Sequence, residues 1–171
     1  MKIGFCIECG SPLEKQNDTR YDCPNGHIFW NNAKTCVTVA LVREDGKILY
    51  AKRAIEPKMG LYNLPGGYLD FNETPRDAAV RELHEELGIT INANDLVLLD
   101  GYRSDYSENV AIIDLAFLVD IWQSTPRPLD ETSELLWESP DFINDPRFSE
   151  PTYRGLENLI REYAARHGRP E

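Results

Sequence analysis

The sequence predicts an α/β domain with a mixed sheet and helices on both of its faces, preceded by a small N-terminal unit rich in cysteine. Short apolar runs of strand length recur between residues 36 and 137, and two segments carry apolar residues at helical spacing. Three of the four cysteines precede the first of these runs. With 171 residues, of which 42% are hydrophobic, the chain can bury a sizeable core, and we expect two parts, residues 1–33 and 34–171.

The expected strands begin after the N-terminal unit. Residues 36–42 and 47–53 have the composition of strands, and the Asp45-Gly46 pair between them is a hairpin signal. A loop rich in Gly and Pro, residues 54–67, leads from the second strand to the first helix. The later elements are strands over residues 96–102 and 110–121, a loop over residues 126–133 and a short strand that includes Trp137.

The first helix has both a start and a stop signal. Thr74 is a suitable N-cap, Pro75 suits the first helical position, and Asp77 places negative charge in the first turn. Gly88 is the expected C-terminal stop. The apolar stripe of this helix consists of Ala79, Val80, Leu83 and Leu87.

A second helix is expected over about residues 152–166. Its buried stripe consists of Leu156, Leu159, Ile160 and Tyr163. The residues around Pro170 follow it as a frayed end.

The first helix carries three glutamates on one side. At roughly 100° per residue, Glu82, Glu85 and Glu86 fall within an arc of about 100° on the face away from Leu83. Like charges at these spacings destabilise a bare helix by a few tenths of a kcal/mol per pair, which predicts a neutralising partner. Oxygen ligands without cysteine or histidine favour Mg²⁺ or Mn²⁺ over zinc, and Mg²⁺ completes its shell with waters and phosphates. The alternative is a solvated acidic face.

The stretch GYLDFNETPRDAAVRELHEELGI, residues 67–89, favours the metal. It matches, at every specified position, the Nudix box G-x5-E-x7-R-E-U-x-E-E-x-G-U, in which U is a bulky aliphatic residue. The matching residues are Gly67, Glu73, Arg81, Glu82, Leu83, Glu85, Glu86, Gly88 and Ile89. The chain therefore resembles a Nudix hydrolase from about Lys34 onward, and the resemblance implies the α/β/α sandwich with a mixed sheet that is typical of this family.

The resemblance also implies a reaction and its metal ligands. Glu82, Glu85 and Glu86 are expected to bind Mg²⁺ or Mn²⁺, and the backbone carbonyl of Gly67 is expected to add a ligand. The implied reaction is attack of a metal-activated water on a phosphorus of a nucleoside diphosphate linked to another moiety. This reaction releases a nucleoside monophosphate.

Two further roles in the expected site are the orientation of the metal ligands and general-base catalysis. Glu73 and Arg81 are expected to form an internal pair in which the guanidinium holds the carboxylate in a planar fork. That pair would fix the loop against the helix and orient the ligands. The general base is either a box glutamate, Glu82 or Glu85, or a residue outside the box. Glu131 and Glu134 are the outside candidates, and their alternative is a solvated acidic loop.

The cysteines form a second motif. Cys6-x2-Cys9-Gly10 is followed by Cys23-Pro24-Asn25-Gly26-His27, an arrangement typical of a zinc ribbon. Gly26 stands where the second knuckle usually has its second cysteine, and His27 follows. We therefore expect a structural zinc site of Cys6, Cys9, Cys23 and His27. Cys36 is the competing fourth ligand, although it lies in the apolar run TCVTVALV, where a cysteine is usually a core residue.

The alternative for the cysteines is a disulfide framework. Residues 1–10 contain no apolar core of a secretory signal, and no run approaches transmembrane length. We therefore expect a cytoplasmic protein, in which this cysteine spacing indicates metal binding. A redox role for Cys6 and Cys9 is a further alternative.

The net charge of −11 argues against nucleic acid and against acidic membranes as main partners. Few basic residues lie near the ribbon, namely Lys2, Lys15, Arg20 and Lys34. We therefore expect the ribbon to serve as a scaffold or to form a homodimer.

Sequence segments outside the box bear on the substrate. The zinc-ribbon family member that cleaves NADH has an S-Q-P-W-P-type sequence after the box, which LLDGYRSDYSENVAIID lacks. The segments FCIECGSPL and RAIEPKMGLYNLPGGYLD are more similar to proteins proposed to cleave FAD or ADP-ribose. A nucleotide conjugate of the FAD, ADP-ribose or NADH type is therefore the expected partner. Candidate aromatic residues for the adenine are Tyr62, Phe71, Tyr102, Tyr106 and Trp137.

Three other functions stay open. A hydrolase of oxidised nucleoside triphosphates is the second substrate class. A nucleotide sensor would bind ADP-ribose without cleaving it, although such proteins commonly lose box carboxylates and this box is complete. A zinc-ribbon protein that binds nucleic acid would show steeply salt-dependent binding.

Overall fold

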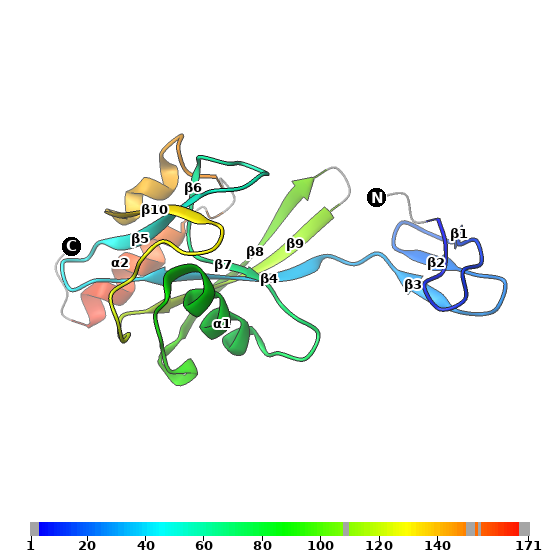
Figure 1. Ribbon diagram of the computed structural model, residues 1–171, viewed down its shortest axis with the longest axis horizontal. Helices are drawn as coiled ribbons and strands as arrows, with labels where there is room; N and C mark the ends of the chain where they lie inside the picture. The colour runs from blue at the N-terminus through cyan, green and yellow to red at the C-terminus, as the bar shows by residue number, and fades with distance from the viewer. Residues whose placement is uncertain (1–3, 108–109, 150–152, 154, 168–171) are drawn as a thin grey trace. The chain divides into compact units, whose positions relative to one another are not determined.

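The computed structural model describes residues 4–107, 110–149, 153 and 155–167 (Figure 1). Residue contacts group residues 1–34 and 105–112 into a smaller unit, and residues 35–104 and 113–171 into a larger one. None of the described helices is both long enough and apolar enough to span a membrane.

The smaller unit contains a three-stranded antiparallel sheet in the order β1-β2-β3. Its strands are β1 (Glu14–Lys15), β2 (Arg20–Asp22) and β3 (Ile28–Trp30). Between β1 and β2 the side-chain oxygen of Asn17 accepts hydrogen bonds from the backbone N–H groups of Thr19 and Arg20. Such an Asx turn reverses the chain locally, so the polar segment between the cysteine pairs forms a hairpin.

Two further sheets, in the orders β7-β4-β9-β8 and β10-β5-β6, lie mostly in the larger unit. The pairs β4/β7, β5/β6 and β5/β10 are antiparallel, and a parallel bridge joins Tyr62 to Phe148. The strands are β4 (Lys34–Leu41), β5 (Ile48–Arg53), β6 (Tyr62–Asn63), β7 (Gly66–Tyr68), β8 (Val97–Ser107), β9 (Val110–Val119) and β10 (Thr132–Glu138).

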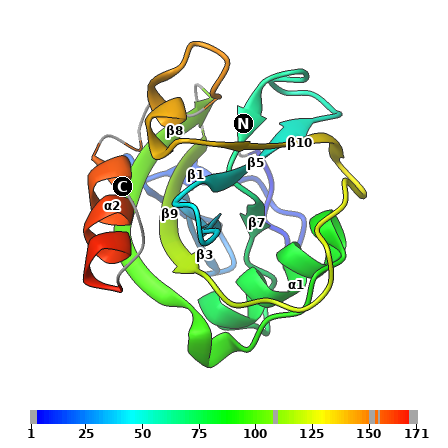
Figure 2. The same cartoon turned by 90° about the vertical axis from the view of Figure 1, so that its left-hand side faces the viewer.

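Among the described residues, helices α1 (Pro75–Leu87) and α2 (Leu156–Arg166) cover the sheets, and the short 3₁₀ turns η1 (Ala93–Asp95) and η2 (Pro140–Asn144) connect other elements. Alternate side chains of β4 enter two separate cores, because successive residues of a strand point to opposite faces. Val37 and Val39 pack with α1, whereas Ala40, and Val42 just after the strand, pack on the α2 side. Figure 2 shows the two helices on opposite sides of the strands. The expected α/β/α layering is therefore confirmed.

The expected hairpin is correct at its turn and wrong in its strand pairing. Gly46 has a φ of 77° and donates its N–H to the carbonyl of Arg43, and Val42 bridges Ile48. Beyond that bridge, β4 and β5 separate into different sheets. A turn signal reports only the local reversal, whereas the partners of the strands are chosen by packing.

Two expected boundaries also differ. The loop expected over residues 54–67 contains the short strand β6 and the beginning of β7, which pair with β5 and β4. Strands this short carry no readable alternation. The last helix begins at Leu156 with Gly155 as its N-cap, and it buries Leu156, Ile160 and Ala164. Residues 152 and 170, where the helix start and a frayed end were expected, lie outside the described residues.

Candidate active site and metal centre

Helix α1 is fixed at both ends by its own sequence. The Thr74 side chain accepts a hydrogen bond from the Asp77 N–H, and the Asp77 carboxylate accepts one from the Thr74 N–H at 3.0 Å. This reciprocal capping box satisfies two backbone donors that the first turn would otherwise leave free. Gly88 ends the helix in the left-handed conformation, with a φ of 66°. The start and stop agree with the sequence prediction, so the register of the three glutamates is set locally.

Two consecutive glycines bring strand β7 close to its neighbours. A Cβ on Gly66 would overlap the carbonyl of Val37, and one on Gly67 would lie 2.6 Å from the carboxyl carbon of Glu82. Only residues without side chains allow this approach. The Gly67 backbone and the Glu82 carboxylate therefore lie against each other, as expected for members of one site.

Glu86 is buried, with 9% of its surface exposed. One of its carboxylate oxygens accepts a hydrogen bond from the Gly66 N–H at 3.1 Å. Burial raises its pKa to about 8, and the charges of Glu82 and Glu131 add to that rise. The sequence predicted the arc of Glu86 on α1 but not its burial, which arises because β7 packs on that side of the helix. A buried carboxylate whose negative charge has few compensating partners is suited to binding a cation.

Arg81 links the box residues. Its Nε and Nη2 donate to the two oxygens of Glu73 at 3.1 and 2.6 Å, which is the fork that the sequence predicts. Its Nη1 donates to Glu82 at 2.8 Å and to Glu85 at 3.0 Å. The Arg81 hydrogen bonds lower the pKa of Glu73, whose carboxylate also accepts from the Asp70 N–H. The guanidinium therefore ties the loop before α1 to the helix and holds two of its glutamates.

The box carboxylates are not gathered around one point. Among the described residues, the only group of three or more metal-type ligand atoms within 4.8 Å of one another lies in the smaller unit. Glu85 is half exposed and engaged by Arg81, whereas burial raises the pKa of Glu82. The donor set nevertheless fits Mg²⁺ or Mn²⁺, since it consists of carboxylate oxygens beside the carbonyl-bearing Gly67 backbone.

The two outside candidates for the general base lie in different surroundings. Glu134 accepts hydrogen bonds from Lys52 and Tyr62, both at 3.0 Å, and these bonds lower its pKa. Glu131 is exposed, and its charge raises the pKa of Glu86. Glu131 is thus within electrostatic reach of the site.

The loop that carries Glu131 also closes the end of α1, which sequence reasoning did not anticipate. The N–H groups of Arg127 and Leu129 donate to the carbonyls of Leu87 and Glu86 at 3.1 and 2.9 Å. The last carbonyls of a helix require hydrogen-bond partners, and this general requirement was the only feature of the sequence that could have indicated the contact.

The candidate aromatic residues have different exposures. Tyr62 is buried and donates to Glu134, and Trp137 stacks on Trp122 with ring centroids 5.9 Å apart. Tyr102 packs edge-on against another tyrosine, whereas Phe71 is fully exposed. The Tyr106 side chain lies outside the described part of the chain. Tyr62 and Trp137 therefore act mainly in the core.

In the smaller unit, two tight turns hold the cysteines. The Cys6 N–H donates to the Ser11 carbonyl at 2.8 Å, and the Cys23 N–H donates to the His27 carbonyl at 3.0 Å. Gly10 and Gly26 have φ values of 70° and 84°, a backbone conformation that residues other than glycine rarely adopt. The early glycine in the second turn lets His27 take the place of the missing cysteine.

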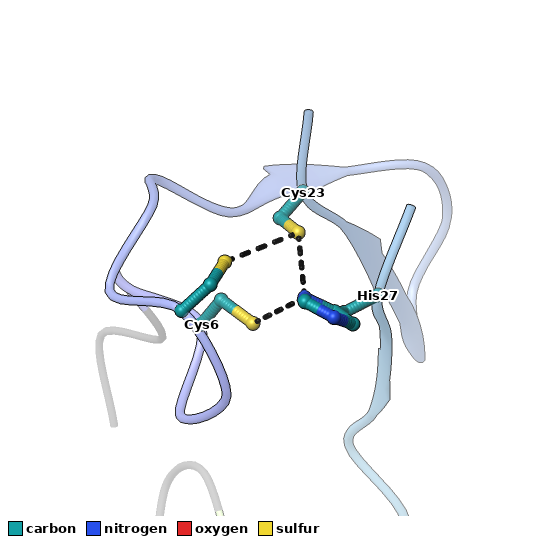
Figure 3. A group of neighbouring side chains, drawn as sticks. Cys6, Cys23 and His27 are labelled. Carbon is teal, nitrogen blue, oxygen red and sulfur yellow. Dashed lines mark hydrogen bonds between the residues drawn. The ribbon is translucent and has the colours of Figure 1, made fainter. Parts of the chain in front are cut away.

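The four predicted ligands converge. Cys9 and Cys23 have their sulfurs 3.8 Å apart, and His27 Nδ1 lies 3.6 Å from the Cys6 sulfur and 3.5 Å from the Cys23 sulfur. Figure 3 shows Cys6, Cys23 and His27 pointing toward one another. A tetrahedral zinc with bonds of about 2.3 Å to sulfur and about 2.0 Å to nitrogen sets two sulfurs about 3.8 Å apart and a sulfur and a nitrogen about 3.5 Å apart. The cluster fits zinc.

The remaining thiol features agree with this fit. None of the four cysteines forms a disulfide, and Cys36 lies buried in β4 within the larger unit. Hydrogen bonds from Ser11 and Asn25 lower the pKa of Cys9 to about 5, which favours the thiolate that metals bind. His27, and not Cys36, therefore completes the cluster.

Comparison with known proteins identifies a family and several relatives of this chain. A family model described as NUDIX domain matches residues 33–159. An ADP-ribose pyrophosphatase from Methanocaldococcus jannaschii is 31% identical over 124 residues, which cover 72% of this chain and 69% of that protein. A MutT-like protein from Streptomyces ambofaciens is 31% identical over 109 residues, which cover 64% of this chain and 66% of that protein.

Solved structures show the same fold. The crystal structure of a NUDIX hydrolase from Nitrosomonas europaea has a TM-score of 0.66 at 27% identity and covers 98% of this chain and 95% of that one. A bifunctional NMN adenylyltransferase/ADP ribose pyrophosphatase from Francisella tularensis has a TM-score of 0.61 at 26% identity. That similarity covers 78% of this chain and 42% of that one.

Proposed function

The chain belongs to the Nudix family, since the family model covers residues 33–159 of its 171, and on that premise we propose that it hydrolyses a pyrophosphate. The proposed substrate is a nucleoside diphosphate linked to another moiety, of the ADP-ribose, FAD or NADH type, and the product is a nucleoside monophosphate. The buried Glu86 carboxylate, beside Glu82 and the β7 glycines, is the observation that carries this proposal. The ADP-ribose pyrophosphatase relative supports the substrate class.

The larger unit's residues have distinct parts in this proposal. Glu82, Glu85, Glu86 and the Gly67 carbonyl would hold Mg²⁺ or Mn²⁺, which when bound neutralises phosphoryl charge and acidifies water. Arg81 orients Glu82 and Glu85 through its Nη1. Its fork to Glu73 keeps the guanidinium in that position.

We propose Glu131 as the general base. Its carboxylate makes no hydrogen bond or ion pair with any described side chain, whereas Glu134 is bound by Lys52 and Tyr62. A carboxylate free of such partners can accept the proton of the attacking water at one of its oxygens. Glu82 is less suited, because Arg81 and the Gly67 backbone already occupy its surroundings.

The smaller unit has a separate, structural role in this proposal. Cys6, Cys9, Cys23 and His27 would close a complete tetrahedral shell, which leaves no position for a reacting water. Zinc there would stabilise the two turns, and the unit would act as a scaffold or dimer contact and not as a nucleic-acid binder.

A substrate panel tests the proposed function. ADP-ribose, FAD and NADH are incubated with the protein and Mg²⁺ or Mn²⁺, and the products are identified. We expect a nucleoside monophosphate, with ¹⁸O from labelled water on one phosphate product only, because water attacks a single phosphorus. Turnover of an oxidised nucleoside triphosphate to monophosphate and pyrophosphate, with no conjugate cleaved, would instead favour the second substrate class.

A further inference from the structure

Arg53, the last residue of β5, has an open guanidinium in an acidic protein. The chain contains 29 Asp and Glu against 18 Lys and Arg. Other arginines of the larger unit pair with carboxylates, among them Arg43, Arg81 and Arg147. Arg53 is partly buried, and its guanidinium donates only through Nε, to the Pro57 carbonyl at 2.8 Å. Its two terminal nitrogens have no acceptor among the residues that the structure describes.

Continuous backbone contacts lead from Arg53 to the catalytic helix. Arg53 is paired with Thr132 in the β5/β10 ladder. The Thr132 N–H donates to the Leu129 carbonyl, and the Leu129 N–H donates to the Glu86 carbonyl, both at 2.9 Å. The next residue after Arg53, Ala54, donates its N–H to the Glu131 carbonyl at 2.7 Å. The end of β5 therefore lies beside the segment that joins the proposed base to α1.

The charge of Arg53 reaches the site without neutralising it. It lowers the pKa of Glu86, against the larger effect of burial. No hydrogen bond or ion pair joins the two side chains in the described structure. The terminal nitrogens of Arg53 are therefore not taken up by Glu86 and stay available for another anion.

We propose that Arg53 binds a phosphate oxygen of the substrate's diphosphate through its terminal nitrogens. This inference rests on the proposed function, which it deepens by naming a residue that selects for the anion. The Pro57 carbonyl holds the Nε side of the guanidinium, so little side-chain freedom is lost when the outer nitrogens bind. Arginine forms two parallel hydrogen bonds with phosphate, which lysine cannot reproduce.

Binding of α,β-methylene-ADP, whose diphosphate resists hydrolysis, tests the proposal directly. Calorimetry in Mg²⁺ compares wild type with Arg53→Met and Arg53→Lys. Arg166→Met is the matched control, because Arg166 is 75% exposed at the end of α2 and pairs only with Glu162 among the described residues. We expect about tenfold weaker binding for Arg53→Met, about threefold weaker binding for Arg53→Lys, and no change beyond twofold in the control.

Kinetics add a readout that a merely structural role would not move. With ADP-ribose as substrate, Arg53→Met should raise KM about tenfold and change kcat less than threefold, because the contact exists before and during the reaction. The melting temperature should stay near that of wild type. Binding within twofold of wild type in folded Arg53→Met, or an equal loss in Arg166→Met, would overturn the proposal.

The design separates this inference from the proposed function. If wild type cleaves no conjugate, the proposed function fails, and the binding series still decides the role of Arg53. If Arg53→Met does not fold, Arg53→Lys serves instead, because it retains the charge and the aliphatic stem. Binding of α,β-methylene-ADP by Arg53→Lys equal to that of wild type would refute the proposed two-point contact of the guanidinium with phosphate.

Discussion

Arg81 holds Glu73 in a two-point fork and, through its remaining Nη1, contacts Glu82 at 2.8 Å and Glu85 at 3.0 Å. One guanidinium therefore connects the loop before α1 to two proposed metal ligands. Lysine has one charged nitrogen and cannot make these contacts together.

Arg81→Lys should therefore lower kcat and weaken Mn²⁺ binding about 10- to 100-fold, the usual cost of losing a group that orients metal ligands. Titration of activity against Mn²⁺ measures the change, and circular dichroism checks the fold. Unchanged Mn²⁺ affinity in the lysine variant would show that the fork is not needed to orient the glutamates.

Glu86→Gln keeps the size of the side chain and removes its charge. We expect kcat to fall by about 10²-fold or more, because a neutral amide is a poor ligand for a hard divalent cation. Steady-state rates at saturating Mg²⁺ measure the effect. Turnover equal to that of wild type would exclude Glu86 from the metal site.

The same variant has a pH signature in buffer free of Mg²⁺ and Mn²⁺. The pKa of Glu86 is about 8 in the folded protein against an ordinary value of 4.5, so the folded state retains a proton between these values. Wild-type stability should therefore fall as pH rises from about 4.5 to about 8, at up to about 1.4 kcal/mol per pH unit from this group. Glu86→Gln should escape that loss, and urea unfolding at pH 5 and pH 9 compares the two. An equal pH dependence would contradict the burial of the charge.

Gly67→Ala tests the close approach of β7 to α1. The new Cβ would displace the Glu82 carboxylate, so activity should fall by about tenfold or more while the sheet stays intact. Gly101→Ala is the control, because a Cβ there meets its nearest atom at an ordinary 3.5 Å. Similar activity in the two variants would mean that the Glu82 position is not critical.

Two glutamine variants decide between the outside bases. Glu131→Gln should lower kcat about 10²-fold or more and flatten the acidic limb of the pH–rate profile. Glu134→Gln should leave that limb in place, since Glu134 is held by Lys52 and Tyr62. The reverse result would assign the base to Glu134.

Cys9→Ser should remove zinc and lower the melting temperature, while the folded fraction keeps its Mg²⁺- or Mn²⁺-dependent activity. Cys36→Ala is the control that should retain zinc, because Cys36 lies in β4, outside the cluster. Metal analysis of protein purified without chelator measures the content. Absence of zinc from wild type would refute the site.

Helix α1, its ends and the cysteine turns could be predicted from the sequence, because their signals are local. Thr74 and Asp77 cap within one turn, Gly88 ends the helix, and Cys6 and Cys9 share a single knuckle. The match of the box to a known family fixed the expected fold by resemblance, and the helices on two faces agree with it.

Only the tertiary structure decided what surrounds these groups. The position of Glu86 on one side of α1 was predicted correctly from the sequence. Its burial depends on β7, a three-residue strand that pairs with β4, which lies far from it in the sequence. The nearness of Glu131 and Arg53 to the helix likewise depends on the β5/β10 register. Burial and long-range charge are properties of folded neighbours, so the raised pKa of Glu86 and the open fork of Arg53 have no local signal in the sequence.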